Sequence, residues 1–481
     1  MSLFKNKIIK NFSILTGTNI LIQVLSIFSS IRLARQLQPE RYGVFNLIAL
    51  QSSIFSIFAC YGLRIVIIRH IARNNNDARK VFVLSGHIRL VTTAIALILL
   101  FFYNLVYGQE SLSTLLVLAV MALIVFQTSW DTIESIFFGF EKMETSGIIN
   151  LIFTLIWIAE IYIIPNSHFN VEVLAFAFLL NQGLKSLLYY FWMRRSIFKK
   201  MPSTSFNNYS EHVDFIKQSN FFFVLAIFSS IQNQMPILLL QFNSTVDQIG
   251  LFNLGSRLLS PLQMLLNLLL AALFPMLSRL AIDNKPLFAV RVKSLMNIII
   301  LSGILGSVLF ALFSNDIVYL LYGEAYKTTA RVILIQCWFT VLFAIFCTIG
   351  SVLSALDKQK LLSRLSIIYA TTACPIFFIG TKYGAIGLAW AFVIAGFVNM
   401  TYHWVIFRSL INKNVSLLYS ISIFSVIGIL SFFTGFYEIN IPFLMRLSLG
   451  LILSILFFSY SYKIEYKNIL SKFFSKVENN D

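Results

Sequence analysis

The sequence predicts an all-α integral membrane protein with about 14 membrane-spanning helices: two six-helix lobes related by a parallel repeat, plus two extra C-terminal helices. Composition, the lengths of the apolar runs and one repeated stretch lead to this prediction. Hydrophobic residues make up 58% of the 481-residue chain, and charged residues only 12%. Soluble globular proteins have about 45–50% apolar and about 25% charged residues, so the chain is not a soluble globule.

The apolar runs set the number of spans, because a helix needs about 20 mostly apolar residues to cross a bilayer. The predicted spans lie near residues 11–31, 42–63, 81–104, 114–137, 147–164, 171–193, 218–241, 249–277, 292–313, 328–354, 361–379, 384–406, 415–435 and 441–462. Most of the 37 lysine and arginine residues fall in alternate connections between these spans. The positive-inside rule therefore predicts a multi-pass protein with both termini in the cytoplasm.

A repeated stretch defines the internal organisation of the chain. Glu-Arg-Tyr-Gly-Val-Phe-Asn-Leu at residues 40–47 returns as Asp-Gln-Ile-Gly-Leu-Phe-Asn-Leu at residues 247–254. The first copy joins predicted spans one and two, and the second joins spans seven and eight. The offset between the copies is therefore an even number of spans, which predicts parallel repeats, as in two-lobed transporters whose substrate path lies between the lobes.

The longest polar interruption, residues 194–214, separates the two predicted lobes. We expect an N-lobe over residues 1–193, a cytoplasmic linker over 194–217, a C-lobe over 218–408, and spans 13 and 14 with a cytoplasmic tail over 409–481. The predicted outer loops are all short. An enzyme acting on sugars at the outer face would need a larger outer domain for its carboxylates, so no catalytic residues are predicted.

The sequence contains no motif for a metal or a nucleotide cofactor. The four cysteines lie in apolar runs without CxxC spacing, and the five histidines are scattered without an HExxH motif. There is no GxxxxGK[ST] loop, so we expect no metal and no cofactor, and any pumping must use an ion gradient. The net charge of +17 follows from the topology and indicates contact with anionic membrane lipids rather than with nucleic acid.

Polar residues recur at helical spacing inside the predicted spans, which favours a hydrated cavity over a sealed bundle. The stripes include Thr16, Asn19 and Gln23 in the first span, Gln127, Asp131 and Glu134 in the fourth, Asn181, Lys185 and Tyr189 in the sixth, Gln234 and Gln241 in the seventh, and Asn253 and Arg257 in the eighth. Pro236 in the seventh span is expected to kink its helix.

The ionisable residues inside the spans are candidates for function, because each costs about 2.5–3.5 kcal/mol on membrane-insertion scales unless it is paired or solvated. Lys185 lies roughly 12 Å from the inner end of its span, too deep for an end anchor, which favours a functional role. Asp131 has two open interpretations, a structural pair with Arg89 or a role in ion coupling. Glu134 either reaches the interface or takes part in coupling, and Glu160 is equally open.

Four short motifs resemble a known family. They are Leu33-Ala34-Arg35 followed by Pro39-Glu40-Arg41-Tyr42-Gly43, Phe274-Pro275-Met276-Leu277-Ser278-Arg279, Leu321-Tyr322-Gly323-Glu324-Ala325-Tyr326, and Tyr383-Gly384-Ala385-Ile386-Gly387. Together they resemble Wzx-type polysaccharide flippases of the MATE-like MOP superfamily, over spans 1 to 12. The resemblance implies alternating access in the bacterial cytoplasmic (inner) membrane, with an undecaprenyl-pyrophosphate-linked glycan as cargo for O-antigen or other surface polysaccharide. Its implied partners are membrane lipids and the polymerase and chain-length regulator of the same pathway.

With such a cargo, we expect Arg257 and Lys185 to attract the pyrophosphate, and polar stripes such as Thr16, Asn19 and Gln23 to accommodate the glycan. The alternative for Arg257 is a salt bridge to Glu160. Other functions remain open. A MATE-type cation exporter typically has an acidic residue in the first span, which is absent here, and a lipid II flippase usually has cavity arginines there. A membrane polymerase or glycosyltransferase is disfavoured by the repeat and the short outer loops.

Overall fold

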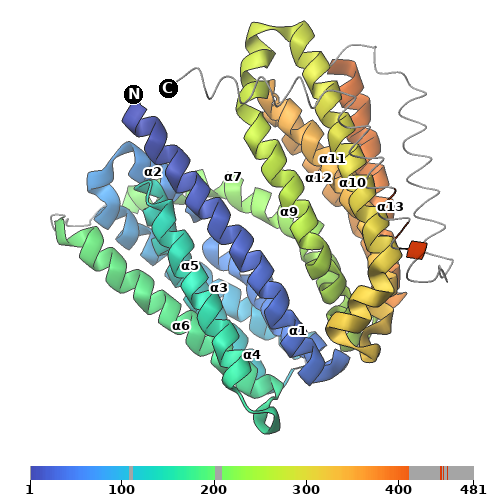
Figure 1. Ribbon diagram of the computed structural model, residues 1–481. Helices are drawn as coiled ribbons and strands as arrows, with labels where there is room; N and C mark the ends of the chain where they lie inside the picture. The colour runs from blue at the N-terminus through green and yellow to red at the C-terminus, as the bar shows by residue number, and fades with distance from the viewer. Residues whose placement is uncertain are drawn as a thin grey trace. The chain divides into compact units, whose positions relative to one another are not determined.

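The protein is helical throughout the part of the chain that the structure describes (Figure 1). The structure is a computed structural model, and it describes residues 2–107, 112–200 and 209–410 together with residues 445, 446, 448 and 452. Within these ranges there are thirteen α-helices, a few short 3₁₀ turns and no strand. The chain divides into two compact units, Met1–Gly250 and Leu251–Asp481. The predicted all-α membrane fold is confirmed.

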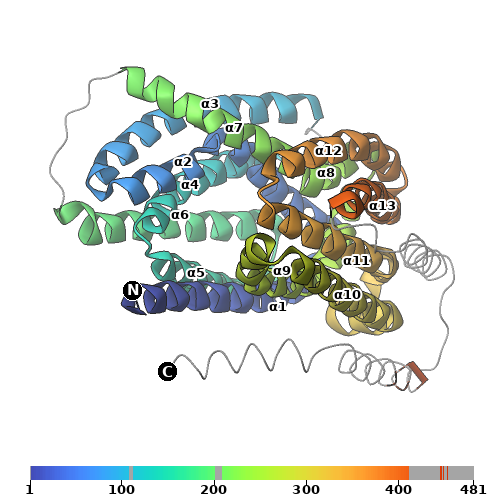
Figure 2. The same ribbon diagram turned by 90° about the horizontal axis from the view of Figure 1, so that it is seen from above.

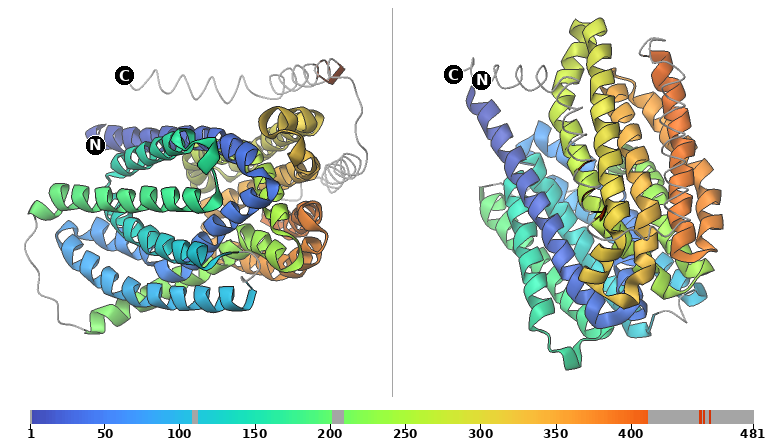
Figure 3. Two further views of the ribbon diagram at one scale, coloured as in Figure 1. Left: turned by 90° about the horizontal axis from the view of Figure 1, so that it is seen from below. Right: turned by 45° about the vertical axis from the view of Figure 1, so that its right-hand side comes forward.

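The first unit is a bundle built around the long helix α1, with α5 beside α1 and α4 packed on both α2 and α6 (Figures 1 and 3). Its helices are α1 (Ser2–Cys60), α2 (Leu63–Arg73), α3 (Ala78–Tyr107), α4 (Thr114–Gly139), α5 (Met143–Ile163), α6 (Val171–Ser196), α7 (Tyr209–Asn233), α8 (Met235–Asn243) and the first residues of α9 (Val246–Asp283). Because α7 and α8 contact α1, they belong to this unit. The lobe boundaries predicted at residues 193 and 218 stay a prediction.

Helix α1 contains the first two predicted spans. Its apolar part, Ile14–Cys60, would be roughly 70 Å long as one straight helix, more than twice the bilayer core of about 30 Å. The backbone is non-helical at Gln38, with φ 61° and ψ 167°, and the next residue is Pro39. Gln38 and Pro39 therefore separate the two crossings, between the predicted spans at residues 11–31 and 42–63.

The seventh predicted span is broken. Helices α7 and α8 meet at Gln234 with a bend of 54°, and Pro236 is in the first turn of α8. Proline is favourable in a first turn because the amide hydrogen that it lacks would have no helical acceptor there. The bend predicted at Pro236 is thus present, two residues before the proline itself.

The glycines that align in the repeat lie against each other in the first unit. A Cβ added to Gly43 would lie 2.1 Å from the carbonyl oxygen of Val246, and one added to Gly250 would lie 2.9 Å from the carbonyl oxygen of Pro39. Pro39 and Val246 are themselves equivalent positions of the two copies. Each copy therefore needs its glycine, because the backbone of the other copy occupies the space of a side chain.

The second unit consists of the rest of α9 with α10 (Lys285–Tyr322), α11 (Lys327–Ala355), α12 (Gln359–Thr381) and α13 (Gly384–Leu410). Helix α11 packs between α10 and α13, and α12 packs on α13 (Figure 2). Its core is apolar, with Ile333, Trp338 and Val341 fully buried. Predicted spans 13 and 14 lie outside the described residues, apart from a few positions in the last span.

The helices of the two units also end in matching turns, which adds to the evidence from the repeated stretch. Helix α4 ends in a turn through Glu141 at φ 57°, and α11 ends in a turn through Asp357 at φ 55°. The next residues, Lys142 and Lys358, precede α5 and α12 with the same φ of −98°. This match indicates that α4 and α11 are equivalent helices of the repeat. Likewise, α3 and α10 begin at positions separated by the same number of residues as Gly43 and Gly250.

Candidate functional site: a buried charge network in the first unit

The site begins at a break in the chain after α1. Tyr61 and Gly62 both have positive φ, at 48° and 65°, and this turn allows α2 to start at Leu63. Gly62 is required because L-residues rarely adopt this conformation and because an added Cβ would lie 2.5 Å from the amide nitrogen of Phe223. The apolar positions of α2 pack into the core at helical spacing. As a result, Arg64 in the first turn is held next to α4.

Two arginines bind the carboxylates of α4. The Arg64 Nη1 atom is 2.5 Å from Asp131 Oδ1 and 2.7 Å from Glu134 Oε2. Arg89 on α3 approaches Asp131 from the other side, with Nη2 2.6 Å from Oδ2, and also donates to the carbonyl oxygen of Thr128. The side chains of Arg89 and Glu134 are only 5% and 7% exposed. The four groups form a network with no net charge, which lowers the cost of placing them inside a membrane.

Glu134 is also hydrogen-bonded from two further helices. Its Oε1 accepts from Ser146 Oγ and, at 3.1 Å, from Asn150 Nδ2, both on α5. The hydroxyl of Tyr189 on α6 is 3.4 Å from the same oxygen and 2.9 Å from Ser146 Oγ. Five helices, α2 to α6, therefore contribute to one network. A substitution at Glu134 would remove contacts to α2, α5 and α6.

Lys185 lies beside this network without a carboxylate partner. It is buried on α6, and its Nζ is 3.8 Å from the centre of the Trp130 ring, next to Asp131 in the sequence. A cation over an aromatic face is attracted to the ring, yet the contact leaves the charge uncompensated. No residue that the structure describes in this unit forms an ion pair with Lys185. The site as a whole therefore carries one excess positive charge.

A second polar layer consists of neutral amides. Gln51 on α1 accepts a hydrogen bond from Asn104 Nδ2 at 3.2 Å. Gln241 on α8 accepts from the Tyr103 hydroxyl at 2.7 Å and is 3.5 Å from Gln51. Gln127 on α4 donates to Ser52 at 3.3 Å. This amide layer joins the broken seventh span to α1 and α3, and it binds no charge.

The other predicted site residues occupy varied positions. On α1, Thr16 and Gln23 are half-buried, and Asn19 is exposed. Asn181 is buried and donates to the carbonyl oxygen of Phe153 at 3.1 Å, which is a helix-packing contact. Glu160 is half-buried on α5.

Arg257 and Asn253 lie half-buried on α9 in the second unit. A joint role of Arg257 with Lys185 involves both units and stays a prediction, as does the alternative salt bridge to Glu160.

Arg89 and Asp131 do lie together, as one of the two interpretations of Asp131 predicted. Arg64 is the residue of the network that the sequence did not predict. It follows the predicted second span at residues 42–63, and the arginines at positions 64, 69 and 73 are typical of a cytoplasmic connection. The signal that could have found it is Gly62 followed by apolar residues at the helical spacing of Leu63, Val66, Ile67 and Ile71.

The structural comparisons identify transporters with the same fold. The inward-closed lipid II flippase MurJ superposes with a TM-score of 0.68 at 17% identity, covering 93% of this chain and 98% of that one. An inward-facing multidrug MATE transporter of the MOP superfamily gives 0.62 at 15% identity, covering 82% and 96%. A MOP superfamily transporter from Pyrococcus furiosus gives 0.53 at 15% identity, covering 84% and 97%.

The sequence comparisons give one family and no individual relative. Comparison with curated proteins returns no match. Residues 8–281 match the family described as "Polysaccharide biosynthesis protein", and this range is more than half of the chain. The resemblance drawn from the short motifs is thus confirmed: the chain belongs to the polysaccharide biosynthesis protein family and has the fold of MOP-superfamily transporters.

Proposed function

We propose that this protein flips undecaprenyl-pyrophosphate-linked oligosaccharide repeat units across the bacterial cytoplasmic membrane for surface polysaccharide synthesis, such as O-antigen or capsule. Alternating access of two lobes, driven by an ion gradient, would move the cargo from the cytoplasmic to the outer leaflet. Both termini would lie in the cytoplasm. The family match and the transporter fold support this proposal. The observation that carries it is the buried, unpaired cation of Lys185.

Lys185 favours an anionic cargo. A charge inside the membrane costs about 2.5–3.5 kcal/mol on insertion scales. The neighbouring network offsets only part of this cost, because its two carboxylates already bind Arg64 and Arg89. A pyrophosphate would supply the missing negative charge, and the attraction is stronger in a site of reduced dielectric than in water. Arg257 would add a forked donor for phosphate oxygens from the second unit.

The glycan would contact neutral polar groups. Thr16, Asn19 and Gln23 on α1 offer hydroxyl and amide groups from one helix face, and Asn253 on α9 adds another amide. Asn181 lies one turn before Lys185 on α6, and its amide donates to the carbonyl oxygen of Phe153 on α5.

Ion coupling would involve the carboxylates of α4. In the observed arrangement, Arg64 contacts both Asp131 and Glu134, so guanidinium groups occupy the positions of a bound cation. A proton or Na⁺ would therefore bind in a second arrangement, in which α2 moves Arg64 away from α4. The carboxylates would thus bind Arg64 in one state and a proton or Na⁺ in the other. An ion gradient would drive the change between these two states.

The direct test is a flipping assay in proteoliposomes. Purified protein is reconstituted with a labelled undecaprenyl-pyrophosphate oligosaccharide, and a membrane-impermeant glycosidase reports the fraction of glycan in the outer leaflet. We expect transfer that depends on the protein and increases with an imposed proton or sodium gradient. Failure of transfer, combined with gradient-driven efflux of an organic cation such as ethidium, would identify a cation exporter instead. Elongation of the glycan would identify a polymerase.

A further inference from the structure

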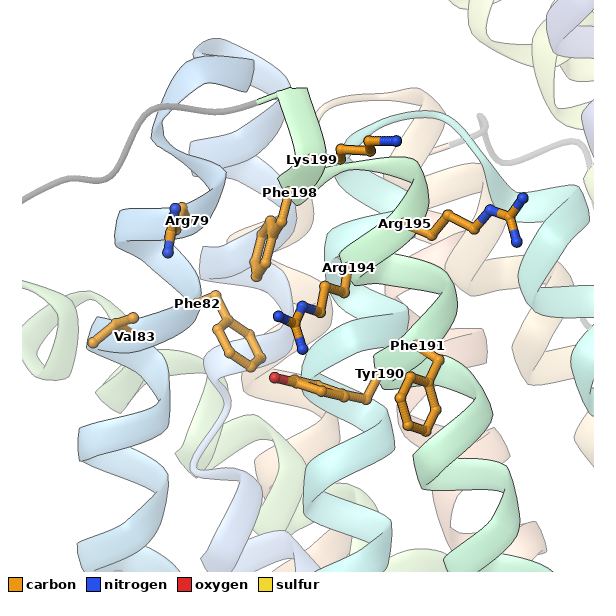
Figure 4. Close-up of a pocket in the computed structure, with 9 residues that line it drawn as sticks. All are labelled: Arg79, Phe82, Val83, Tyr190, Phe191, Arg194, Arg195, Phe198 and Lys199. Carbon is orange, nitrogen blue, oxygen red and sulfur yellow. The ribbon is translucent and has the colours of Figure 1, made fainter.

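A cavity lies between α3 and α6, at the end of the bundle that is predicted to be cytoplasmic. It has a volume of about 810 Å³ and is lined by residues of α3 and α6 and of the 3₁₀ turn after α6 (Phe198–Lys200). The lining residues are Arg79, Phe82, Val83, Tyr190, Phe191, Arg194, Arg195, Phe198 and Lys199 (Figure 4). Four of the nine are cations, four are aromatic, and none is acidic or an amide. This composition favours a ligand that has both an anionic group and an apolar part.

The cations of this cavity have no carboxylate partner in the described part of the first unit. Arg79, Arg194, Arg195 and Lys199 form no ion pair with any residue that the structure describes in the first unit. The residue after Arg79 behaves differently, since Lys80 is paired with Glu211 on α7. In Figure 4 the Arg194 guanidinium lies beside Phe82 and Tyr190, facing the side of Arg79, whereas Arg195 and Lys199 extend away from it. Arg79 and Arg194 are therefore the central pair for an anion, and their guanidinium groups match phosphate oxygens.

An apolar groove continues from the cavity along the helices. It has a volume of about 650 Å³, lies between α3, α4 and α6, and shares Phe82 and Tyr190 with the cationic cavity. From Phe82 to Leu97 it follows α3 for roughly 22 Å, compared with roughly 15 Å for one leaflet of the bilayer core. Leu90 and Leu187 on its rim are 71% and 53% exposed, so the groove is open to the side. Its length accommodates an acyl chain.

We propose that this cavity and groove bind one anionic phospholipid of the inner leaflet, with the phosphodiester between Arg79 and Arg194 and one acyl chain between α3, α4 and α6. Basic pockets between membrane helices on the cytoplasmic side are typical sites for such headgroups. The cavity favours a phospholipid over the glycan cargo, because it lacks the amides and carboxylates that would hydrogen-bond sugars. The groove is also lined by Arg89, so the bound lipid would lie against the buried charge network. This proposal does not depend on the proposed transport function.

The test measures lipid binding by the purified, delipidated full-length protein in native mass spectrometry. Phosphatidylglycerol is titrated against phosphatidylcholine with matched acyl chains. We expect at least one phosphatidylglycerol to bind about tenfold more tightly than phosphatidylcholine, and Arg79→Gln/Arg194→Gln to lose that difference. Arg73→Gln is the matched control, because Arg73 is exposed at the same end of the bundle but outside the cavity. Equal phosphatidylglycerol binding by the double variant and the control would overturn the proposal.

A second variant tests the groove without changing charge. Gly86 lines the groove, and a Cβ added there meets no atom within 4 Å, so Gly86→Leu should fold and fill the space of the acyl chain. We expect Gly86→Leu to lower phosphatidylglycerol binding about tenfold, and Gly17→Leu, at an equally open glycine of α1, to leave it unchanged. Undecaprenyl pyrophosphate is the third probe. Tight binding of that probe without binding of phosphatidylglycerol would contradict the phospholipid assignment.

Discussion

The two units of the molecule share helix order and helix ends, but only the first has a charge network at these positions. Arg89 and Met296 occupy equivalent places in α3 and α10, counted from the helix start, and both are buried. Counted back from the shared turn at Glu141 and Asp357, Asp131 corresponds to Cys347 and Glu134 to Gly350. These three charged positions therefore have uncharged counterparts in the second unit.

The backbone differs as well. The first unit breaks its helix at Tyr61 and Gly62, and this break brings Arg64 to α4. Helix α9, most of which lies in the second unit, continues from Val246 to Asp283 and passes the position that corresponds to this break. Between α9 and α11, Gln336 Nε2 donates to Ser256 Oγ at 2.8 Å, which is a contact between neutral groups. The comparison indicates that charge in the first unit serves a task that the shared fold does not require.

The largest expected effect comes from making the first unit resemble the second at Arg89. Arg89→Met leaves Asp131 with one arginine instead of two, and breaking a buried ion pair typically costs about 3–5 kcal/mol. We expect a loss of about 3 kcal/mol in thermal unfolding of the purified protein, and recovery of most of it in Arg89→Met/Asp131→Asn. The control Met296→Leu should cost less than about 1.5 kcal/mol. Wild-type stability in Arg89→Met would mean that the network does not stabilise the fold.

A smaller effect is expected from the helix break. Gly62→Ala places a Cβ in a left-handed backbone conformation, which costs roughly 1–2 kcal/mol before any overlap with Phe223. Because the break positions Arg64, the variant should also shift the distance between α2 and α4, measured by spin labels on exposed residues. Gly86→Ala, at an open helical glycine, is the control and should be neutral or slightly stabilising. An unchanged α2 to α4 distance would show that Gly62 does not position Arg64.

The smallest effect is expected where the two units are alike, at their neutral hydrogen bonds. Asn104→Leu in the first unit and Gln336→Leu in the second each remove one bond between helices. Such bonds contribute about 0.6 kcal/mol on average within membranes, so both variants should melt within a degree or two of wild type. A large loss for Asn104→Leu alone would show that the amide layer, like the charge network, is specialised in the first unit.

The sequence predicted the helices well because span length reports directly on the thickness of the bilayer. It also predicted that Arg89 and Asp131 were candidates for one pair, since both lie at similar depth. It could not place Arg64, because the position of that residue depends on two left-handed backbone angles and on the packing of Ile67 and Ile71. The contact of Lys185 with Trp130 was equally hidden, because it joins residues of different helices.

Lys185 tests the central claim most directly, namely that the excess positive charge of the first unit attracts an anionic cargo. The measurement is the initial rate of flipping of the undecaprenyl-pyrophosphate oligosaccharide for Lys185→Met, Lys185→Arg and the exposed control Lys360→Met. We predict at least a tenfold loss for Lys185→Met, partial activity for Lys185→Arg and a normal rate for Lys360→Met. Thermal stability of Lys185→Met should be unchanged or higher, because the buried charge has no ion-pair partner to lose. Flipping by Lys185→Met at the wild-type rate would contradict the claim.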